Sequence, residues 1–395
     1  MKKFNNILFT LVFLGIIFSV GTISFLKQDR NISSIENRTL AQRPDLTKQS
    51  FLSGEYFKNF ETYFSDQLAG RDEIIKVYTE EQLFLNKTII NNIVVAKDNW
   101  LLYNPSTENV KKEMDKSLSN LNNLADTFKG TGVEFYFAAA PYKMNILKDI
   151  YPSYINEQLG VQNQKYFMSH LPSSYHGINL YQYFKQNYSE PQLKSMYFKT
   201  DHHWNIEGAF AGYQEIIKQM SAASKQFKAK PVNKENLSLV CNHKSSFVGT
   251  LNLRLYSLID TNEEKICYYD PVFNPKTGKV TVQTGTGDAL TNINQIYGAG
   301  FNKKEVLYGD LFTWDLAEIN YEYQNTGNDL HLLVLKDSYA NPIQPFIAEH
   351  FNKTSVLDIR HYHKTSVAQY IKDNKIDIVL FLYNDSNLTG AMYEF

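Results

Sequence analysis

Cysteine is scarce in this sequence, since the 395 residues include only Cys241 and Cys267. Two thiols are too few for a disulfide-rich scaffold or for a zinc site with four thiolate ligands. One disulfide in an oxidising compartment is possible, and the spacing alone does not show whether the two residues pair. The sequence also lacks an HExxH motif or a similar spacing of metal ligands, which argues against a metal site.

An excess of charge of either sign is also missing. The chain has 40 Lys and Arg against 41 Asp and Glu, a formal net charge of −1. This balance argues against binding to nucleic acid, which requires a basic face, and against an acidic disordered chain. The hydrophobic fraction of 43%, with 27 Tyr and 26 Phe, is ample for a large core.

Beyond the N-terminus the sequence has no long apolar run. Residues 7–26 form an uncharged run that two lysines precede. A helix of this length spans about 30 Å, the thickness of the hydrocarbon core of a bilayer. We therefore predict a single-pass membrane anchor within residues 1–30, with the rest of the chain outside the cytoplasm. A cleaved signal peptide is the alternative, because residues 19–21 (SVG) resemble a cleavage site.

The rest of the chain is predicted to form a stalk followed by one large domain. Residues 31–75 are polar at first and then amphipathic, which indicates an extended stalk and a helix. In residues 76–395, strands alternate with helices, as in an α/β domain whose parallel sheet is covered on both faces. The region 225–325 is rich in Asn, Thr, Gly and Tyr, and we predict a β-rich insertion there. Strands are expected at 133–139, 331–336, 355–360 and 376–383, and a hairpin at 93–103.

Candidate catalytic residues occur first in the segment Thr200–Asn205 (TDHHWN), just before a predicted helix. Residues that precede a helix N-cap are usually extended, so side chains two apart point the same way. Asp201 and His203 are then expected to share a face, and His202 to point away from it. A carboxylate beside an imidazole fixes its tautomer, as a general base requires. Two alternatives stay open, namely packed or surface histidines and a metal site.

A second candidate is Ser338, which lies between a hydrophobic strand and a helix. Catalytic groups of open α/β sheets collect at the carboxyl ends of the strands, where backbone N–H groups of the next helix can stabilise an oxyanion. Ser338 is therefore a candidate nucleophile, with His203 and Asp201 as candidates for its activation. The alternative is an ordinary serine N-cap.

The order of these motifs resembles the DHHW proteins, relatives of the SGNH-like alginate O-acetyltransferases. The resemblance rests on Glu36–Ala41, Phe64–Gln67, Gly70–Asp72, Asp98–Tyr103, Pro141–Lys143, Asp201–Asn205, Lys336–Tyr339 and Leu357–Arg360. It covers about residues 35–385 and implies a three-layer α/β/α fold like that of the SGNH hydrolases. Lys336 and Asp337 stand before Ser338 where many members of the family have glycine.

The resemblance implies a polysaccharide O-acetyltransferase with Ser338 as nucleophile, His203 as general base and Asp201 as its orienting carboxylate. We expect that this mechanism needs no metal and no organic cofactor. It also implies a polysaccharide acceptor, and acetyl groups supplied by a multispanning membrane acyltransferase. Two alternatives stay open, an extracellular acetylesterase with the same triad and a non-catalytic scaffold that presents polysaccharide.

Four other residues are candidates for binding the substrate or an oxyanion. Arg360, Tyr383 and Asn384 end predicted strands, and Trp204 follows the candidate base. An arginine can bind a sugar hydroxyl, an asparagine can donate to an oxyanion, and a tryptophan can stack on a sugar ring. Ion pairing, turn formation and core packing are the alternatives for the same residues.

Overall fold

The computed structural model describes residues 2–395 apart from 34, 37, 106–108, 156–158, 244, 262, 271–277, 284–288, 291–296, 299 and 324–325. Contacts divide the chain into two compact units, Met1–Asn91 with Leu253–Leu258, and Asn92–Asn252 with Ile259–Phe395. The boundaries predicted at residues 30 and 75, which separate the anchor, the stalk and the large domain, stay predictions.

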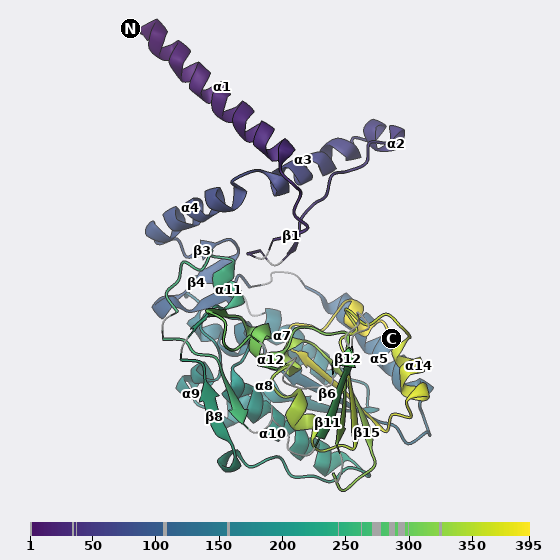
Figure 1. The fold of residues 1–395 in the computed structure, drawn as a ribbon. Coiled ribbons are helices and arrows are strands. Elements are labelled where there is room, and N and C mark those ends of the chain that lie inside the picture. Colours follow the sequence, from purple (N-terminus) through teal and green to yellow (C-terminus); the bar gives the residue numbers. More distant parts are fainter. Residues whose placement is uncertain are drawn as a thin grey trace. The chain divides into compact units, whose positions relative to one another are not determined.

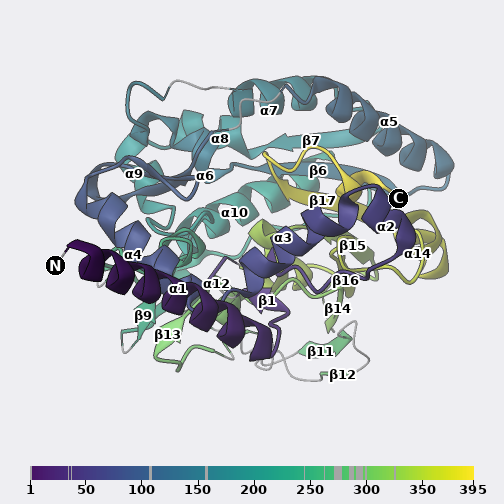
Figure 2. The ribbon, with the colours of Figure 1, turned by 90° about the horizontal axis from the view of Figure 1, so that it is seen from above.

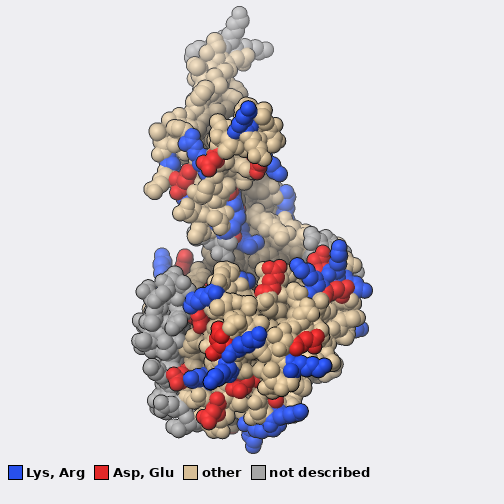
Figure 3. Space-filling model, turned by 90° about the vertical axis from the view of Figure 1, so that its right-hand side faces the viewer, with Lys and Arg blue, Asp and Glu red and all other residues tan. Residues whose placement is uncertain are grey.

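The first unit is mainly helical and begins with a long apolar helix. Its elements are α1 (Lys2–Leu26), β1 (Ile32–Ser33), β2 (Arg38–Thr39), α2 (Lys48–Leu52), α3 (Glu55–Gln67), α4 (Arg71–Phe84) and β3 (Ile89–Ile90) (Figure 1). Within α1, the segment Asn5–Leu26 has a mean hydropathy of 2.4 and is long and apolar enough to cross a membrane. On the face seen in Figure 3 this segment carries no charged side chain. A signal sequence meets the same criteria, so the length and composition of α1 fit both an anchor and a signal.

Ion pairs connect three of the sequence motifs within this unit. Arg38 forms a bidentate pair with Asp66, with 2.8 Å between Nη1 and Oδ2. Arg71 pairs with Glu36 at 2.8 Å. The hydrogen bond from Arg38 lowers the pKa of Asp66 to about 2. These ion pairs give the three motifs a structural role within the first unit, and this role does not depend on catalysis.

The second unit is built on a sheet with the strand order β12-β11-β14-β16-β15-β17-β6-β7 (Figure 2). Five neighbouring strands are parallel: β16 (Lys353–Leu357), β15 (His331–Lys336), β17 (Ile378–Asn384), β6 (Glu134–Ala140) and β7 (Tyr175–Asn179). The antiparallel edge consists of β14 (Glu318–Tyr323), β11 (Gly278–Gln283) and β12 (Ala289–Leu290). The strands predicted near 133–139, 331–336, 355–360 and 376–383 are all present. The sheet is mixed because the region 225–325 contributes its antiparallel edge.

Helices cover both faces of this sheet, because alternate side chains of each strand enter different apolar layers. In β6, for example, Tyr136 and Ala138 belong to one layer and Phe135 and Phe137 to the other. The first layer includes α8 (Leu180–Asn187), α10 (Ile206–Ala223) and α13 (Gln344–Ala348), and the second includes α5 (Lys111–Thr127), α7 (Leu159–Ser169) and α14 (Val367–Asp373). The predicted three-layer α/β/α arrangement is confirmed.

Shorter elements complete the second unit. They are β4 (Ile93–Val95), β5 (Leu101–Tyr103), α6 (Lys143–Ile146), α9 (Glu190–Ser195), β8 (Ser238–Cys241), β9 (Ser246–Phe247), α11 (Thr250–Leu253, whose last residue belongs to the first unit), β10 (Cys267–Asp270), β13 (Glu305–Val306) and α12 (Tyr308–Phe312). The hairpin predicted at 93–103 is confirmed by the antiparallel pairing of β4 with β5.

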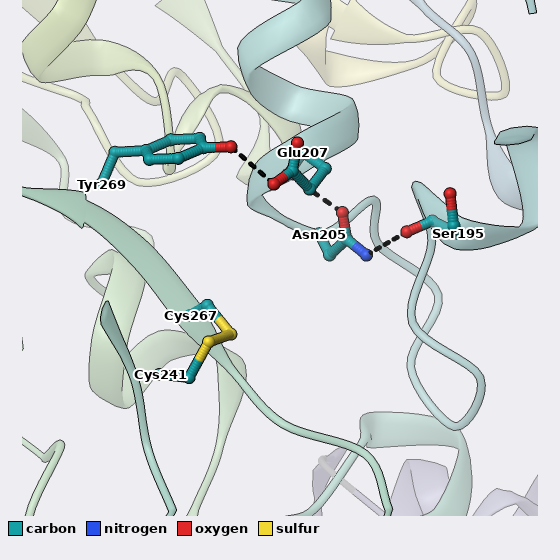
Figure 4. Close-up of a disulfide and its surroundings, with 6 residues drawn as sticks. All are labelled: Ser195, Asn205, Glu207, Cys241, Cys267 and Tyr269. Atoms are coloured by element: carbon teal, nitrogen blue, oxygen red, sulfur yellow. Dashed lines mark hydrogen bonds between the residues drawn. A yellow bond between two sulfur atoms is a disulfide. The ribbon is translucent and has the colours of Figure 1, made fainter. Parts of the chain in front are cut away.

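A disulfide joins strands β8 and β10, so the pairing that the sequence left open is present (Figure 4). On β10, two residues after Cys267, the Tyr269 hydroxyl donates to a carboxylate oxygen of Glu207 at 2.5 Å. Asn205 caps this end of α10 by accepting from the backbone N–H of Glu207. The disulfide-linked strands are thereby attached to the start of α10, directly after the TDHHWN segment.

Candidate active site

Ser338 lies at the carboxyl end of β15, where the chain enters a short 3-10 helix, Ser338–Ala340. The N-cap of this helix is Asp337, whose Oδ1 accepts from the backbone N–H of Tyr339 at 2.8 Å. Its Oδ2 accepts three further hydrogen bonds, from the backbone and side chain of Asn384 and from Asn387. Burial raises the pKa of Asp337 even though these bonds lower it. Because Asp337 caps the helix, the Ser338 hydroxyl is not used as a cap.

The Ser338 hydroxyl is hydrogen-bonded to His203 instead. Its Oγ lies 2.8 Å from Nε2 of His203, and Nδ1 of His203 lies 2.6 Å from Oδ1 of Asp201. Asp201 and His203 are 1% and 4% exposed. A carboxylate at Nδ1 favours the tautomer that carries its proton there, which leaves Nε2 as an acceptor for the serine proton. The three residues predicted from the sequence therefore lie in one hydrogen-bonded chain.

Asp201 accepts hydrogen bonds on both carboxylate oxygens. Oδ1 also accepts from the backbone N–H of His203, and Oδ2 accepts from the backbone N–H and the hydroxyl of Thr250. Burial opposes ionisation, but electrostatic interactions with His203 and His202 and these hydrogen bonds hold the pKa of Asp201 well below its usual range. Gly249 allows this approach, because a Cβ there would lie 2.2 Å from the carbonyl carbon of Thr200. Asp201 is therefore a fixed anion behind the imidazole.

The expectation that His202 points away from His203 is wrong. The two ring centroids are 3.8 Å apart, and Nδ1 of His202 lies 3.1 Å from the Thr250 hydroxyl. Residues 201–203 form a bend in which Asp201 accepts from the backbone of His203, whereas the prediction assumed an extended strand. Asp201 and His203 thus meet through this turn, which also brings His202 beside them.

Two further residues hold this group in place. The Tyr308 ring stacks on His203 at 3.7 Å between centroids with an interplanar angle of 3°, and its hydroxyl donates to the carbonyl of Ser338. The buried Lys143 ammonium donates to three carbonyl oxygens, those of Leu101, Lys199 and Asp201, and burial lowers its pKa. The motif Pro141–Lys143 pointed to Lys143, whereas no sequence signal pointed to Tyr308.

The family described as SGNH hydrolase-like domain, acetyltransferase AlgX, matches residues 93–264. The structure of Bacillus cereus PatB1 is 41% identical, covers 77% of this chain and 99% of that chain, and superimposes with a TM-score of 0.71. The chain belongs to this SGNH-like acetyltransferase family.

Other structures extend this family assignment. PatB1 with a sulfonyl adduct is likewise 41% identical, with a TM-score of 0.70 over 77% of this chain and 97% of that chain. A DHHW family protein from Eubacterium siraeum is 20% identical over 77% of this chain and 94% of that chain, with a TM-score of 0.55, and supports the fold. A comparison with curated proteins gives no match. The predicted resemblance and the SGNH-like fold are confirmed.

In the described structure, none of the four additional candidate residues is hydrogen-bonded to the Ser338 hydroxyl, whose partner is His203. Trp204 is fully buried and its indole donates to the carbonyl of Tyr339. Tyr383 is also buried and donates to Met392, while Asn384 donates to Asp337. Arg360 forms ion pairs with Asp358 and Asp315. Their roles in binding substrate stay predictions.

Two groups of side chains in the described structure have ligand atoms close enough for a metal ion. The first group consists of Asp201, His202 and His203. In it, Oδ1 of Asp201 is already hydrogen-bonded to Nδ1 of His203, and Nε2 of His203 is hydrogen-bonded to Ser338. The second group consists of Asp315, Asp358 and His361. Its carboxylates are neutralised by the Lys336 ammonium, 2.9 Å and 3.1 Å away, and by Arg360. The carboxylates of both groups are therefore satisfied by the protein itself.

Asp385 is a buried carboxyl one strand away from Ser338. Its Oδ1 accepts from the backbone of Tyr142 at 3.0 Å and from the amide of Asn145 at 2.6 Å, and its Oδ2 has no partner among the described residues. Burial raises the pKa of Asp385 to about 7.

The variant Asp385→Asn is expected to change how stability depends on pH. Between about pH 4 and about pH 7 the native protein keeps a proton that the unfolded chain releases, so a rise in pH lowers its stability by up to about 1.4 kcal/mol per unit. Asparagine retains the oxygen acceptor and removes this loss. In thermal melts across this range, the melting temperature of the variant should rise relative to that of the unmodified chain. A difference that does not vary with pH would contradict the raised pKa.

Proposed function

We propose that this chain transfers acetyl groups to hydroxyls of a polysaccharide outside the cytoplasm, through an acetyl intermediate on Ser338. The observation that carries the proposal is the position of His203, 2.6 Å from Asp201 and 2.8 Å from Ser338. Membership of an SGNH-like acetyltransferase family supports the reaction class.

In the first half of the proposed reaction, the Ser338 Oγ attacks the acetyl carbonyl while its proton passes to Nε2 of His203. The tetrahedral intermediate collapses, the bond to the donor oxygen breaks, and His203 returns the proton to that oxygen. In the second half, an acceptor hydroxyl gives its proton to His203 and attacks the acetyl group. Ser338 leaves and takes the proton back. Asp201 stays ionised throughout and stabilises the imidazolium.

The proposal requires a donor for the oxyanion of the tetrahedral intermediate. Ser338 is the first residue of its short helix, and its backbone N–H donates no hydrogen bond within the described part of the chain. We assign this N–H as one donor, since it belongs to the residue that is attacked. Asn384 is a less direct candidate, because its amide donates to Asp337.

Two features support an extracytoplasmic location. The apolar helix α1 suits an anchor, and the Cys241–Cys267 disulfide is typical of an oxidising compartment. We propose that α1 is a single-pass anchor and that a multispanning membrane acyltransferase supplies the acetyl groups.

Product analysis tests the proposed function. The purified full chain in detergent is incubated with a chromogenic acetyl ester, with and without oligosaccharides. We expect release of the chromophore in both cases, and acetylated sugar in place of part of the acetate when an acceptor is present. Acetate as the sole product with every acceptor would support the esterase, and absence of turnover would support the scaffold. Because PatB1 has been obtained with a sulfonyl adduct, a sulfonyl fluoride is a suitable inhibitor.

A further inference from the structure

A cavity of about 250 Å³ lies beside the proposed active site, at the same edge of the sheet. Its walls include Tyr142 and Asn145, which follow β6, and Ser386, which follows β17. Ser338 follows β15, which pairs with β17, and β17 pairs with β6. The cavity is therefore formed where the carboxyl ends of neighbouring parallel strands meet, as ligand sites of α/β sheets commonly are.

Ring contacts connect this cavity with the candidate base. Tyr103 lines the cavity, and its ring centroid is 6.0 Å from that of His202, which itself stacks on His203 at 3.8 Å. On the other side, Tyr142 lies 6.2 Å from the ring of Tyr339, the residue after Ser338. A molecule in the cavity therefore lies within a few side chains of the reacting hydroxyl.

The composition of the walls suits a sugar ring. Three tyrosines, Tyr103, Tyr142 and Tyr151, offer apolar faces for stacking. Asn104 offers an amide that can donate to and accept from sugar hydroxyls, and the Ser386 hydroxyl, which donates to Asn384, can still accept from one. Small-molecule sites usually range from about 300 to 1,000 Å³, so this smaller cavity suits a single ring better than a long oligosaccharide.

The floor of the cavity is held rigidly. Asp385, which is fully buried, accepts from the backbone of Tyr142 and from the side-chain amide of Asn145. Gly160 packs over that amide, because a Cβ at Gly160 would lie 2.1 Å from Oδ1 of Asn145. The Tyr151 hydroxyl donates to the carbonyl of Tyr103 at 2.6 Å and joins the two aromatic walls. A site whose polar groups are fixed in advance loses less entropy when a ligand binds.

We propose that this cavity is an acceptor subsite, which binds one pyranose ring of the polysaccharide next to the ring whose hydroxyl is acetylated. The inference rests on the proposed function and deepens it. The neighbouring ring then lies over Ser338 and His203, and the cavity determines which hydroxyl is presented to the acetyl group.

The test uses two substitutions that fill the cavity from different segments of its lining, Val161→Trp on α7 and Ser386→Trp after β17. Both are made in a full-length chain that carries Ser338→Ala, so that binding is measured without chemistry. Titration calorimetry then follows the binding of β-linked glucose and N-acetylglucosamine tetrasaccharides. We expect each substitution to weaken the binding of at least one tetrasaccharide by about tenfold or more.

Leu239→Trp is the matched control, because this side chain is exposed on β8 and does not line the cavity. Its affinity should stay within about twofold of the parent. Failure of both tetrasaccharides to bind the parent, an unchanged affinity in both cavity variants, or an equal loss in the control would each overturn the subsite. If the tetrasaccharides bind as expected but the active chain acetylates no acceptor, the proposed function fails while the sugar site stands.

Discussion

Replacing Ser338 with alanine is expected to lower the turnover of an acetyl ester by about 10⁴-fold or more, with little change in stability. The large loss follows because the Ser338 Oγ is the group that bonds Nε2 of His203. The small structural effect follows because Asp337, and not Ser338, caps the short helix. Initial rates with a chromogenic ester and a thermal melt of the same preparation measure the two quantities.

Ser195→Ala is a matched control for this change. Ser195 is exposed at the end of α9, and its hydroxyl donates to a backbone carbonyl within the same helix. We expect this variant to keep turnover within about twofold of the unmodified chain, as is usual for surface substitutions. A folded Ser338→Ala protein that retains the turnover of this control would exclude Ser338 as the nucleophile.

Much of the fold could be predicted from the sequence because its core strands are short and strongly apolar. The segments that became β6, β15 and β17 are almost continuous hydrophobic runs, as expected for parallel strands buried on both faces. The edge strands β11 and β14 were harder to place, since they lie in the region 225–325 and lack a continuous hydrophobic run, and the sequence does not show which strand each of them pairs with. Local periodicity carries no information about such pairing.

In the site, too, residues within short motifs could be predicted from the sequence, whereas residues contributed by distant segments could not. Asp201, His203 and Ser338 were identified from short motifs and from the resemblance to a family. Tyr308 and Thr250 complete the surroundings of His203 and Asp201 from segments that carry no motif. Trp204 lies next to the base in sequence, yet its indole is fully buried in the core. Adjacency in the chain therefore did not predict which side chains surround the reacting atoms.

His203→Ala is expected to lower turnover about as much as Ser338→Ala, whereas His202→Ala is expected to cost only about tenfold. His203 is hydrogen-bonded to both other members of the proposed triad. His202 stacks on it and contacts Thr250, which in turn donates to Asp201, so its loss loosens the triad without removing a reacting group. Both variants are measured with the same ester, after a melt confirms that each folds cooperatively.

The double variant Ser338→Ala with His203→Ala distinguishes a catalytic unit from two independent contributions. When two residues act together in catalysis, removing both lowers turnover little more than removing one, so the turnover of the double variant should match that of Ser338→Ala within about tenfold.

Turnover should also fall in acid in the unmodified chain and in His202→Ala, because a protonated imidazole cannot accept the serine proton. If His202→Ala abolishes turnover while His203→Ala retains it, the general base is His202, and the hydrogen bond between His203 and Ser338 has a structural role.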